Sequence, residues 1–234
     1  MKIIILAGGL GTRISEETSD KPKPMVMLID KPILWHIMNI FAKQGHSDFV
    51  IAAGYKAEVI SEWASNLETE WKIQTIDTGL NTQTGGRIKQ CMELYPGERM
   101  LATYGDGVGN INVNNLIAFH ESHGKLATLT AVHPPARFGY LDIANGLVLH
   151  FGEKNQSNAG WINGGFFVIE PQVSGLVKSN DEPFETGALP RLVRSANLMS
   201  FLHDGFWQPM DTLREKEDLS KLARLTTPPW LDGI

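Results

Sequence analysis

The sequence predicts an α/β fold: a mostly parallel, Rossmann-like sheet flanked by helices, with added antiparallel strands in the C-terminal half. Two observations carry this prediction. In the first half of the 234-residue chain, short continuous apolar runs alternate with helical patterns, as is typical of parallel strands that are buried on both faces. In the second half, several strand-like runs follow one another closely, with glycine and proline between them, which favours antiparallel pairing.

The first half is expected to hold four strands and three helices. Each helix places apolar residues at helical spacing on one face, as Ile33, Ile37 and Ile40 illustrate. Gly45 follows the first helix and suits its C-cap. The expected strands cover residues 3–7, 48–53, 72–76 and 100–104, and the expected helices cover 33–43, 57–67 and 84–95.

The second half is expected to add five strands and two helices. Neither a repeat nor a low-complexity linker divides the chain, so we expect a single domain over residues 1–234, with halves 1–110 and 111–234. The expected strands cover residues 127–133, 140–143, 147–151, 161–169 and 198–203, and the expected helices cover 186–196 and 212–225.

Composition argues against several classes of protein. Lys and Arg number 21 against 26 Asp and Glu, whereas a nucleic-acid-binding surface needs clustered excess cations. The single cysteine, Cys91, excludes an intramolecular disulfide and suits a small apolar position on a helix. The N-terminal apolar run is too short for a signal peptide, and no run approaches the roughly 20 apolar residues of a membrane span. We therefore expect a cytoplasmic protein that binds neither nucleic acid nor membrane.

The first expected strand ends in the glycine-rich loop Leu6-Ala7-Gly8-Gly9-Leu10-Gly11-Thr12-Arg13. Glycines expose backbone N–H groups without an obstructing Cβ, so a triphosphate can approach closely. Two common phosphate loops fit poorly, because a Rossmann fingerprint needs glycine at Ile14 and a Walker loop needs Gly-Lys-Ser/Thr at residues 11–13. The loop alone is a weak signal.

A second motif, Lys21-Pro22-Lys23-Pro24-Met25, strengthens the first. Its two prolines stiffen an extended segment and aim the lysines at a fixed place. A cation fixed beside a triphosphate is what phosphoryl-type chemistry requires.

Two aspartates are candidate metal ligands. Asp106 lies between Gly105 and Gly107, directly after an expected strand, and ligands bind at such strand ends in open α/β sheets. An aspartate at this place is as often a turn former. Asp211 could equally cap the helix that begins near residue 212. The seven histidines show no zinc spacing, and a surface helix explains His120 and His123 best.

Taken together, these motifs resemble those of the sugar-1-phosphate nucleotidyltransferases, most closely the cytidylyl branch of that family. The likeness covers nearly the whole chain and continues through residues 31–38, 54–56, 84–87, 104–108, 137–139, 163–167 and 206–212. It implies the fold of the nucleotide-diphospho-sugar transferases, with residues 1–110 as the nucleotide-binding half and residues 111–234 as the acceptor-binding half.

The resemblance also implies residue roles. Lys23 and Arg13 are the expected catalytic residues, acting on the α-phosphate and on the leaving pyrophosphate, while Asp106 and Asp211 are expected to hold Mg²⁺. The expected nucleotide-binding residues are Leu6, Ala7, Gly8, Gly9, Gly11, Thr12, Arg13, Lys23, Thr84, Gly85, Gly86, Arg87, Gly105 and Asp106.

For the acceptor, the resemblance implies a pocket lined by Gly139, Glu153, Lys154 and Asn163, with Lys154 on the phosphate and Glu153 on a sugar hydroxyl. Taken without the resemblance, Glu153 and Lys154 are more simply an exposed charged pair. The chain also departs from the family, because Asn155 stands where a proline is usual.

The implied reaction is attack by a phosphate oxygen of a sugar 1-phosphate, expected to be glucose 1-phosphate, on the α-phosphorus of CTP. An arginine donates but cannot accept hydrogen bonds, so Arg87 suits the O2 and N3 atoms of cytosine better than the N3–H of uracil. The open alternative for Arg87 is a solvated surface side chain.

Three alternatives remain open for the whole protein. The nucleotide could be UTP, the acceptor could be another phosphorylated sugar, polyol or small molecule, or the protein could sense a nucleotide sugar without turning it over. The resemblance further implies a homo-oligomer. Residues 68–71, however, replace a longer insertion that the cytidylyl branch carries near its subunit contacts.

Overall fold

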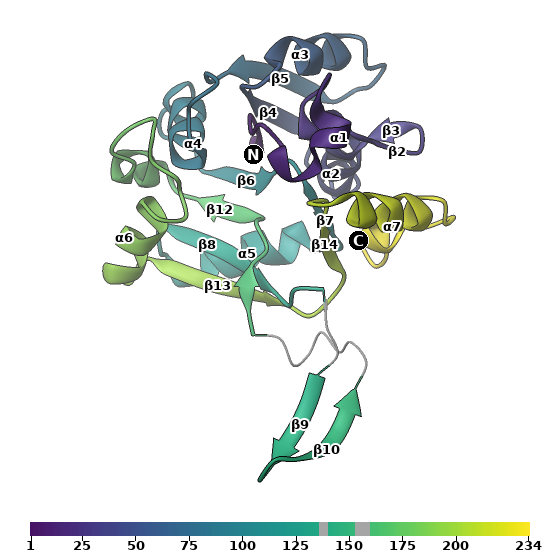
Figure 1. Ribbon diagram of the computed structural model, residues 1–234. Coiled ribbons are helices and arrows are strands. Elements are labelled where there is room, and N and C mark those ends of the chain that lie inside the picture. The colour runs from purple at the N-terminus through teal and green to yellow at the C-terminus, as the bar shows by residue number, and fades with distance from the viewer. Residues whose placement is uncertain (136–139, 153–159) are drawn as a thin grey trace.

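In the computed structural model, which describes residues 1–135, 140–152 and 160–234, one large sheet forms the centre of the molecule (Figure 1). Its strand order is β11-β8-β12-β6-β1-β4-β5, and β13 also pairs with β8. The strands of this sheet are β1 (Ile3–Ala7), β4 (Asp48–Ala53), β5 (Lys72–Asp77), β6 (Met100–Tyr104), β8 (Ala127–Val132), β11 (Ile162–Asn163), β12 (Phe167–Ile169) and β13 (Leu198–His203).

The sheet is parallel over β6, β1, β4 and β5, as the continuous apolar runs predict. Every residue of β1 is buried, and its side chains alternate between two separate cores. Ile3 and Ile5 pack in one core, whereas Ile4 and Leu6 pack in the other. A strand covered on both faces cannot show the apolar and polar alternation of a half-exposed strand, which is why the run is continuous.

Helices cover both faces. Buried side chains of α2 (Ile33–Ala42), α3 (Ala57–Ser65), α5 (Val113–His123) and α7 (Leu213–Ala223) join the first core. Buried side chains of α4 (Thr84–Glu93) and α6 (Ala188–Arg194) join the second. Cys91 lies in the second core, and burial raises the pKa of its thiol to about 12. The expectation of a structural cysteine is therefore confirmed.

Antiparallel pairing enters at β12, which runs against both β6 and β8. β11 also runs against β8, while β13 runs parallel to it. Three small antiparallel pairs lie outside the sheet: β2 (Met27–Leu28) with β3 (Lys31–Pro32), β7 (Gly107–Gly109) with β14 (Trp207–Pro209), and β9 (Tyr140–Ala144) with β10 (Leu147–Gly152).

The predicted fold class is therefore confirmed, and the differences are local. The run at 161–169 is not one strand, because Gly164 and Phe166 separate β11 from β12 and Gly165 takes a positive φ of 77°. The helix expected at 186–196 spans only Ala188–Arg194. α5 belongs to no expected range, and its His120 is buried rather than at the surface.

Over the described ranges, none of the helices is both long enough and apolar enough to cross a membrane.

Candidate active site

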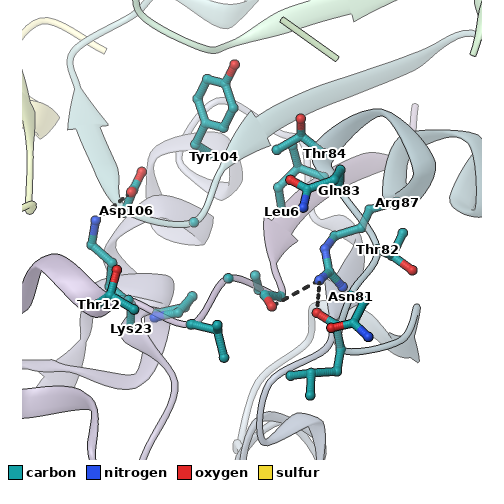
Figure 2. A pocket seen from close by; sticks show the side chains of 18 of the residues that line it. Leu6, Thr12, Lys23, Asn81, Thr82, Gln83, Thr84, Arg87, Tyr104 and Asp106 are labelled. Atoms are coloured by element: carbon teal, nitrogen blue, oxygen red, sulfur yellow. Dashed lines mark hydrogen bonds and ion pairs between the residues drawn. The ribbon is translucent and has the colours of Figure 1, made fainter. Parts of the chain in front are cut away.

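The site lies where the carboxyl ends of the parallel strands meet. In the sheet register, Leu6 pairs with Tyr104, and Ala7 pairs with Ala53. The segments that follow these strands therefore begin at one edge of the sheet, which is where ligands bind in open α/β folds. A cavity of about 510 Å³ opens there (Figure 2). Its lining residues are Leu6, Ala7, Gly8, Gly9, Leu10, Gly11, Thr12, Arg13, Lys23, Pro24, Leu80, Asn81, Thr82, Gln83, Thr84, Arg87, Tyr104, Gly105 and Asp106.

The glycine loop forms one wall of this cavity, and its glycines serve different purposes. Gly11 has a φ of 66° and stands before the short 3₁₀ turn Thr12–Ile14, a left-handed conformation that favours glycine. A Cβ on Gly9 would meet no heavy atom within 4 Å, so its backbone faces open space. A Cβ on Gly8 would overlap the guanidinium of Arg87. Gly9 is thus free to face a ligand, while Gly8 leaves room for an arginine.

Arg87 connects the ends of three parallel strands rather than standing in solvent. Its side chain is buried, and four N–H groups donate to protein oxygens: the carbonyls of Gly8, Ala53 and Leu80, and the hydroxyl of Thr78. Burial lowers the pKa of Arg87, and the negative charge of Asp77, which acts to raise this pKa, only partly compensates.

This geometry corrects the alternative of a solvated surface arginine. The Arg87 side chain does line the cavity. Its terminal N–H groups, however, already donate to the protein, so among the described residues only the Nε–H is left without a partner. The reading of a base by Arg87 stays a prediction, and the contacts assign it a structural role as well.

Gly85 and Gly86 do not line the cavity, although the sequence placed both against the nucleotide. The backbone N–H of Gly85 donates to the carbonyl of Glu182 at 3.1 Å. A Cβ on Gly85 would collide with that carbonyl, and one on Gly86 would collide with the backbone of Asn180. The two glycines therefore admit a neighbouring chain segment. Residues of the preceding loop, Leu80 to Gln83, line the cavity in their place.

Lys23 lies at the centre of a charged cluster. The prolines of its motif hold it in a 3₁₀ turn, Lys23–Met25, and its side chain is only 9% exposed. Its Nζ lies 2.7 Å from Asp106 Oδ2 and 2.6 Å from Asp211 Oδ1, and Arg13 contacts the other oxygen of Asp211 at 2.6 Å. All four predicted charged residues are thus brought together from three distant parts of the chain.

The helix-cap alternative for Asp211 is wrong. Thr212 is the N-cap of α7, because its side chain accepts from the Glu215 N–H and Glu215 completes a capping box. Asp106 does lie in a turn, between β6 and β7, yet its carboxylate points at Lys23. Both carboxylates are therefore directed at the site.

These carboxylates fit a divalent cation. Because both lie within 2.7 Å of the single Lys23 Nζ, they converge on one cation-sized position. No group of three or more His, Cys, Asp or Glu side chains suited to a metal occurs in the described part of the chain. Two carboxylates whose remaining partners are phosphate oxygens and water form the donor set that Mg²⁺ prefers.

The acceptor side is described only in part. Asn163 lies at the end of β11, and its Nδ2 donates to the Tyr104 hydroxyl at 2.9 Å. Gly139, Glu153 and Lys154 lie outside the described residues, so their expected roles stay predictions.

The sequence reasoning missed Tyr104, Pro24 and the loop from Leu80 to Gln83. Tyr104 could have been found, since it is the last residue of a buried strand that ends at the ligand-binding edge. The polar loop carries no comparable signal in its sequence.

Comparisons with known proteins agree with this geometry. Residues 2–221 match the family model described as nucleotidyl transferase. The chain is 46% identical over 253 aligned positions to the glucose-1-phosphate cytidylyltransferase of Salmonella typhimurium, covering 98% of both chains. It is 40% identical to the probable glucose-1-phosphate cytidylyltransferase of Bacillus subtilis, covering 98% of this chain and 99% of that one.

Its fold is shared with a putative glucose-1-phosphate thymidylyltransferase from Bacillus anthracis, at 20% identity and a TM-score of 0.75, covering 96% and 95% of the two chains. The family match spans the glycine loop, the lysine motif and both aspartates. The chain belongs to the nucleotidyl transferase family.

Proposed function

We propose that this protein transfers CMP from CTP to glucose 1-phosphate, giving CDP-glucose and pyrophosphate. The observation that carries the proposal is the 46% identity, along 98% of both chains, to a glucose-1-phosphate cytidylyltransferase. A cavity with a glycine-rich wall, a buried lysine and two converging aspartates supports it.

In this reaction a phosphate oxygen of the sugar phosphate forms a bond to the α-phosphorus of CTP. The bond between that phosphorus and the oxygen bridging to the β-phosphate breaks, and pyrophosphate leaves with the electron pair. The attacking phosphate is already ionised at neutral pH, so a general base has little to do. The protein contributes alignment and neutralisation of charge.

Each charged residue has a proposed role in this step. Lys23 neutralises the α-phosphate, and Arg13 with the open backbone at Gly9 holds the leaving pyrophosphate. Asp106 and Asp211 would hold Mg²⁺, which would supply further neutralisation of phosphate charge. Lys23 pairs with both aspartates in the structure, so the arrival of nucleotide and metal requires this lysine to exchange partners.

The base lies against the loop from Leu80 to Gln83 in this proposal. Asn81, Thr82 and Gln83 line the cavity with amide and hydroxyl groups, and such groups both donate and accept hydrogen bonds. They can therefore match the donor and acceptor pattern of a cytosine edge.

The proposal also includes a homo-oligomeric assembly and a location in the cytoplasm.

A pyrophosphate-release assay tests the proposal. The protein, Mg²⁺ and glucose 1-phosphate are combined with CTP, UTP, GTP or dTTP in turn, and the nucleotide sugar is identified by mass. Release with CTP, and much less with the other three, is expected. Faster release with UTP would reassign the base, and faster release with another phosphorylated acceptor would reassign the acceptor.

A further inference from the structure

A connected set of hydrogen bonds joins the nucleotide cavity to Asn163 through Glu185, a residue without a role in the reaction above. One oxygen of Glu185 accepts from the Tyr104 hydroxyl at 2.6 Å, and the other accepts from the Thr84 hydroxyl at 2.6 Å. The Tyr104 hydroxyl in turn accepts from Asn163 Nδ2 at 2.9 Å. Tyr104 and Thr84 both line the cavity, so Glu185 holds two of its wall residues from behind.

The direction of each proton along this set is settled by chemistry. Burial raises the pKa of Tyr104, and the nearby charge of Glu185 adds to that effect, so the phenol keeps its proton and donates it to Glu185. The backbone N–H of Gly165 donates to Asn163 Oδ1 at 3.0 Å. Because an N–H group can only donate, the Asn163 amide has one orientation, with Nδ2 toward Tyr104. Its second N–H has no partner among the described residues.

A carboxylate is the group that enforces this arrangement. An ionised carboxylate accepts and cannot donate, so both hydroxyls must turn their protons toward Glu185 and their lone pairs away from it. The lone pair of Tyr104 then faces Asn163, and that of Thr84 accepts from the Phe184 N–H at 2.8 Å. A neutral amide at residue 185 would have to donate to one of the two hydroxyls and would reverse its polarity.

Glu185 also lacks the partner that a purely structural carboxylate usually has. In the described parts of the chain it pairs with no lysine, arginine or histidine, whereas Glu182, three residues earlier, pairs with Arg191. An unpaired negative charge near a site that binds phosphates costs free energy. The two hydrogen bonds that Glu185 accepts from Thr84 and Tyr104 offset part of that cost.

We infer that Glu185 is a positioning residue with two arms: one orients Asn163 for the acceptor through Tyr104, and the other orients Thr84, at the start of α4, for the nucleotide. This inference rests on the proposed function, because it assigns one arm to each of the two substrates. Figure 2 shows the Tyr104 hydroxyl directed away from Lys23 and Arg87, as an acceptor-side role requires.

The acceptor arm is tested with Tyr104→Phe, which deletes the hydroxyl and keeps the ring that packs edge-on against Phe167. The KM for glucose 1-phosphate should rise about fivefold, which corresponds to about 1 kcal/mol, the usual net contribution of one hydrogen bond. The KM for CTP should change less than twofold. Tyr95→Phe is the matched control, because it deletes a hydroxyl that contacts Gln74 on β5, and it should change neither KM.

The anchor itself is tested with Glu185→Gln, which keeps the size of the side chain and replaces one acceptor oxygen with a donor. Both KM values should rise, while the midpoint of thermal unfolding should stay within a few degrees of the wild-type midpoint. If the midpoint falls and both KM values stay the same, the role of Glu185 is structural and the inference is overturned.

The possible failures are separable. If the wild-type protein is active and the Tyr104→Phe and Glu185→Gln variants keep both KM values, the inference is overturned and the proposed function stands. An unchanged protein that releases no pyrophosphate from CTP with any sugar phosphate overturns the proposed function, and the inference falls with it.

Discussion

At the scale of single residues, the site depends on how Lys23 is held. The lysine is nearly buried, and the carboxylates of Asp106 and Asp211 neutralise its charge. A buried charge is tolerated only when it is paired. The same pairing holds the Lys23 side chain beside both aspartates until nucleotide and metal bind in the proposed reaction.

Replacing Lys23 should strongly reduce catalysis. Lys23→Ala is expected to lower kcat by about 10²- to 10³-fold, the effect of removing one preorganised group that stabilises developing charge. Single-turnover rates at saturating CTP provide the measurement. Lys43→Ala, at an exposed position after α2, is the control and should leave the rate unchanged. Unchanged turnover in Lys23→Ala would remove this residue from the mechanism.

Asp211 should show a different pattern, because its proposed role is to hold the metal. Asp211→Asn removes the charge that contacts both Lys23 and Arg13 and leaves a weaker ligand for Mg²⁺. Catalysis should fall, and the Mg²⁺ concentration that gives half-maximal rate should rise. Titrations that superimpose for the two proteins would show that Asp211 is not a metal ligand.

At the scale of the elements, the strand ends, the glycine loop and α4 are held together by Arg87. Gly8 and Gly54 leave room for its guanidinium, since a Cβ on either would overlap it. The carbonyls at the ends of β1 and β4 accept its hydrogen bonds. A single buried side chain thereby fixes the cavity wall relative to the sheet.

Substitutions at the adjacent residues Gly8 and Gly9 should have different effects on the free energy of unfolding. Gly8→Ala should lower the free energy of unfolding by about 1–3 kcal/mol, as overpacking of a filled site does. Gly9→Ala should change it by no more than about 0.5 kcal/mol, because its Cβ would project into open space. Urea denaturation of both variants measures this. Equal losses would contradict the structural reason for Gly8.

A second element-level feature joins α5 to β8. The Lys125 N–H donates to His123 Nδ1 at 3.0 Å, so His123 Nε2 carries a proton and donates to Thr128 Oγ1 at 2.8 Å. The Thr128 proton then goes to His120 Nδ1 at 2.8 Å, and His120 Nε2 donates to Glu170 at 3.2 Å. Both imidazoles are therefore neutral in this network.

The network predicts a loss of stability in acid. Burial lowers the pKa of His120 and of His123 below the ordinary value of 6.5, so the unfolded chain binds more protons as the pH falls through that value, and the free energy of unfolding decreases. Although burial acts to raise the pKa of Glu170, hydrogen bonds from Arg99 and His120 lower it, and this group adds a loss at still lower pH. His36 and His203 also have lowered pKa values through burial.

Urea denaturation at pH 7.5 and pH 5.5 measures the effect. His120→Asn should be less stable than the unchanged protein at pH 7.5, yet lose less stability between the two pH values. An equal loss in both proteins would show that His120 does not contribute to the pH dependence.

How much the sequence predicts differs between elements for physical reasons. Strands buried on both faces are continuous apolar runs, so the sequence predicts the bounds of β1, β4 and β6 as the structure has them. β5, at one end of the strand order, has no buried residue, yet its predicted range is one residue short of the observed strand. The reason for Gly85 and Gly86 was not predictable, because the backbone that they admit comes from Asn180 and Glu182, almost a hundred residues later. The hydrogen bond between Thr84 and Glu185 also joins distant parts of the chain, so the sequence around either residue does not predict it.

At the scale of the whole molecule, one sheet serves both substrates in the proposed reaction. Its parallel strands end at the cavity that binds the nucleotide in this proposal, and the strands beyond β6 carry Asn163 toward the same edge. The central sheet is continuous from β5 to β13, so the division into halves at residue 110 stays a prediction. The homo-oligomer also stays a prediction. The 253-position alignment is longer than the 234-residue chain, which agrees with an insertion that this chain lacks.

The measurement that tests the central claim most directly is product formation from CTP, glucose 1-phosphate and Mg²⁺, followed by phosphorus NMR and mass spectrometry. The account predicts equal amounts of pyrophosphate and CDP-glucose, formed by the unchanged protein and reduced at least about a hundredfold in rate in Lys23→Ala. Absence of both products, under conditions in which the protein is folded and every common nucleoside triphosphate and sugar phosphate has been offered, would contradict it.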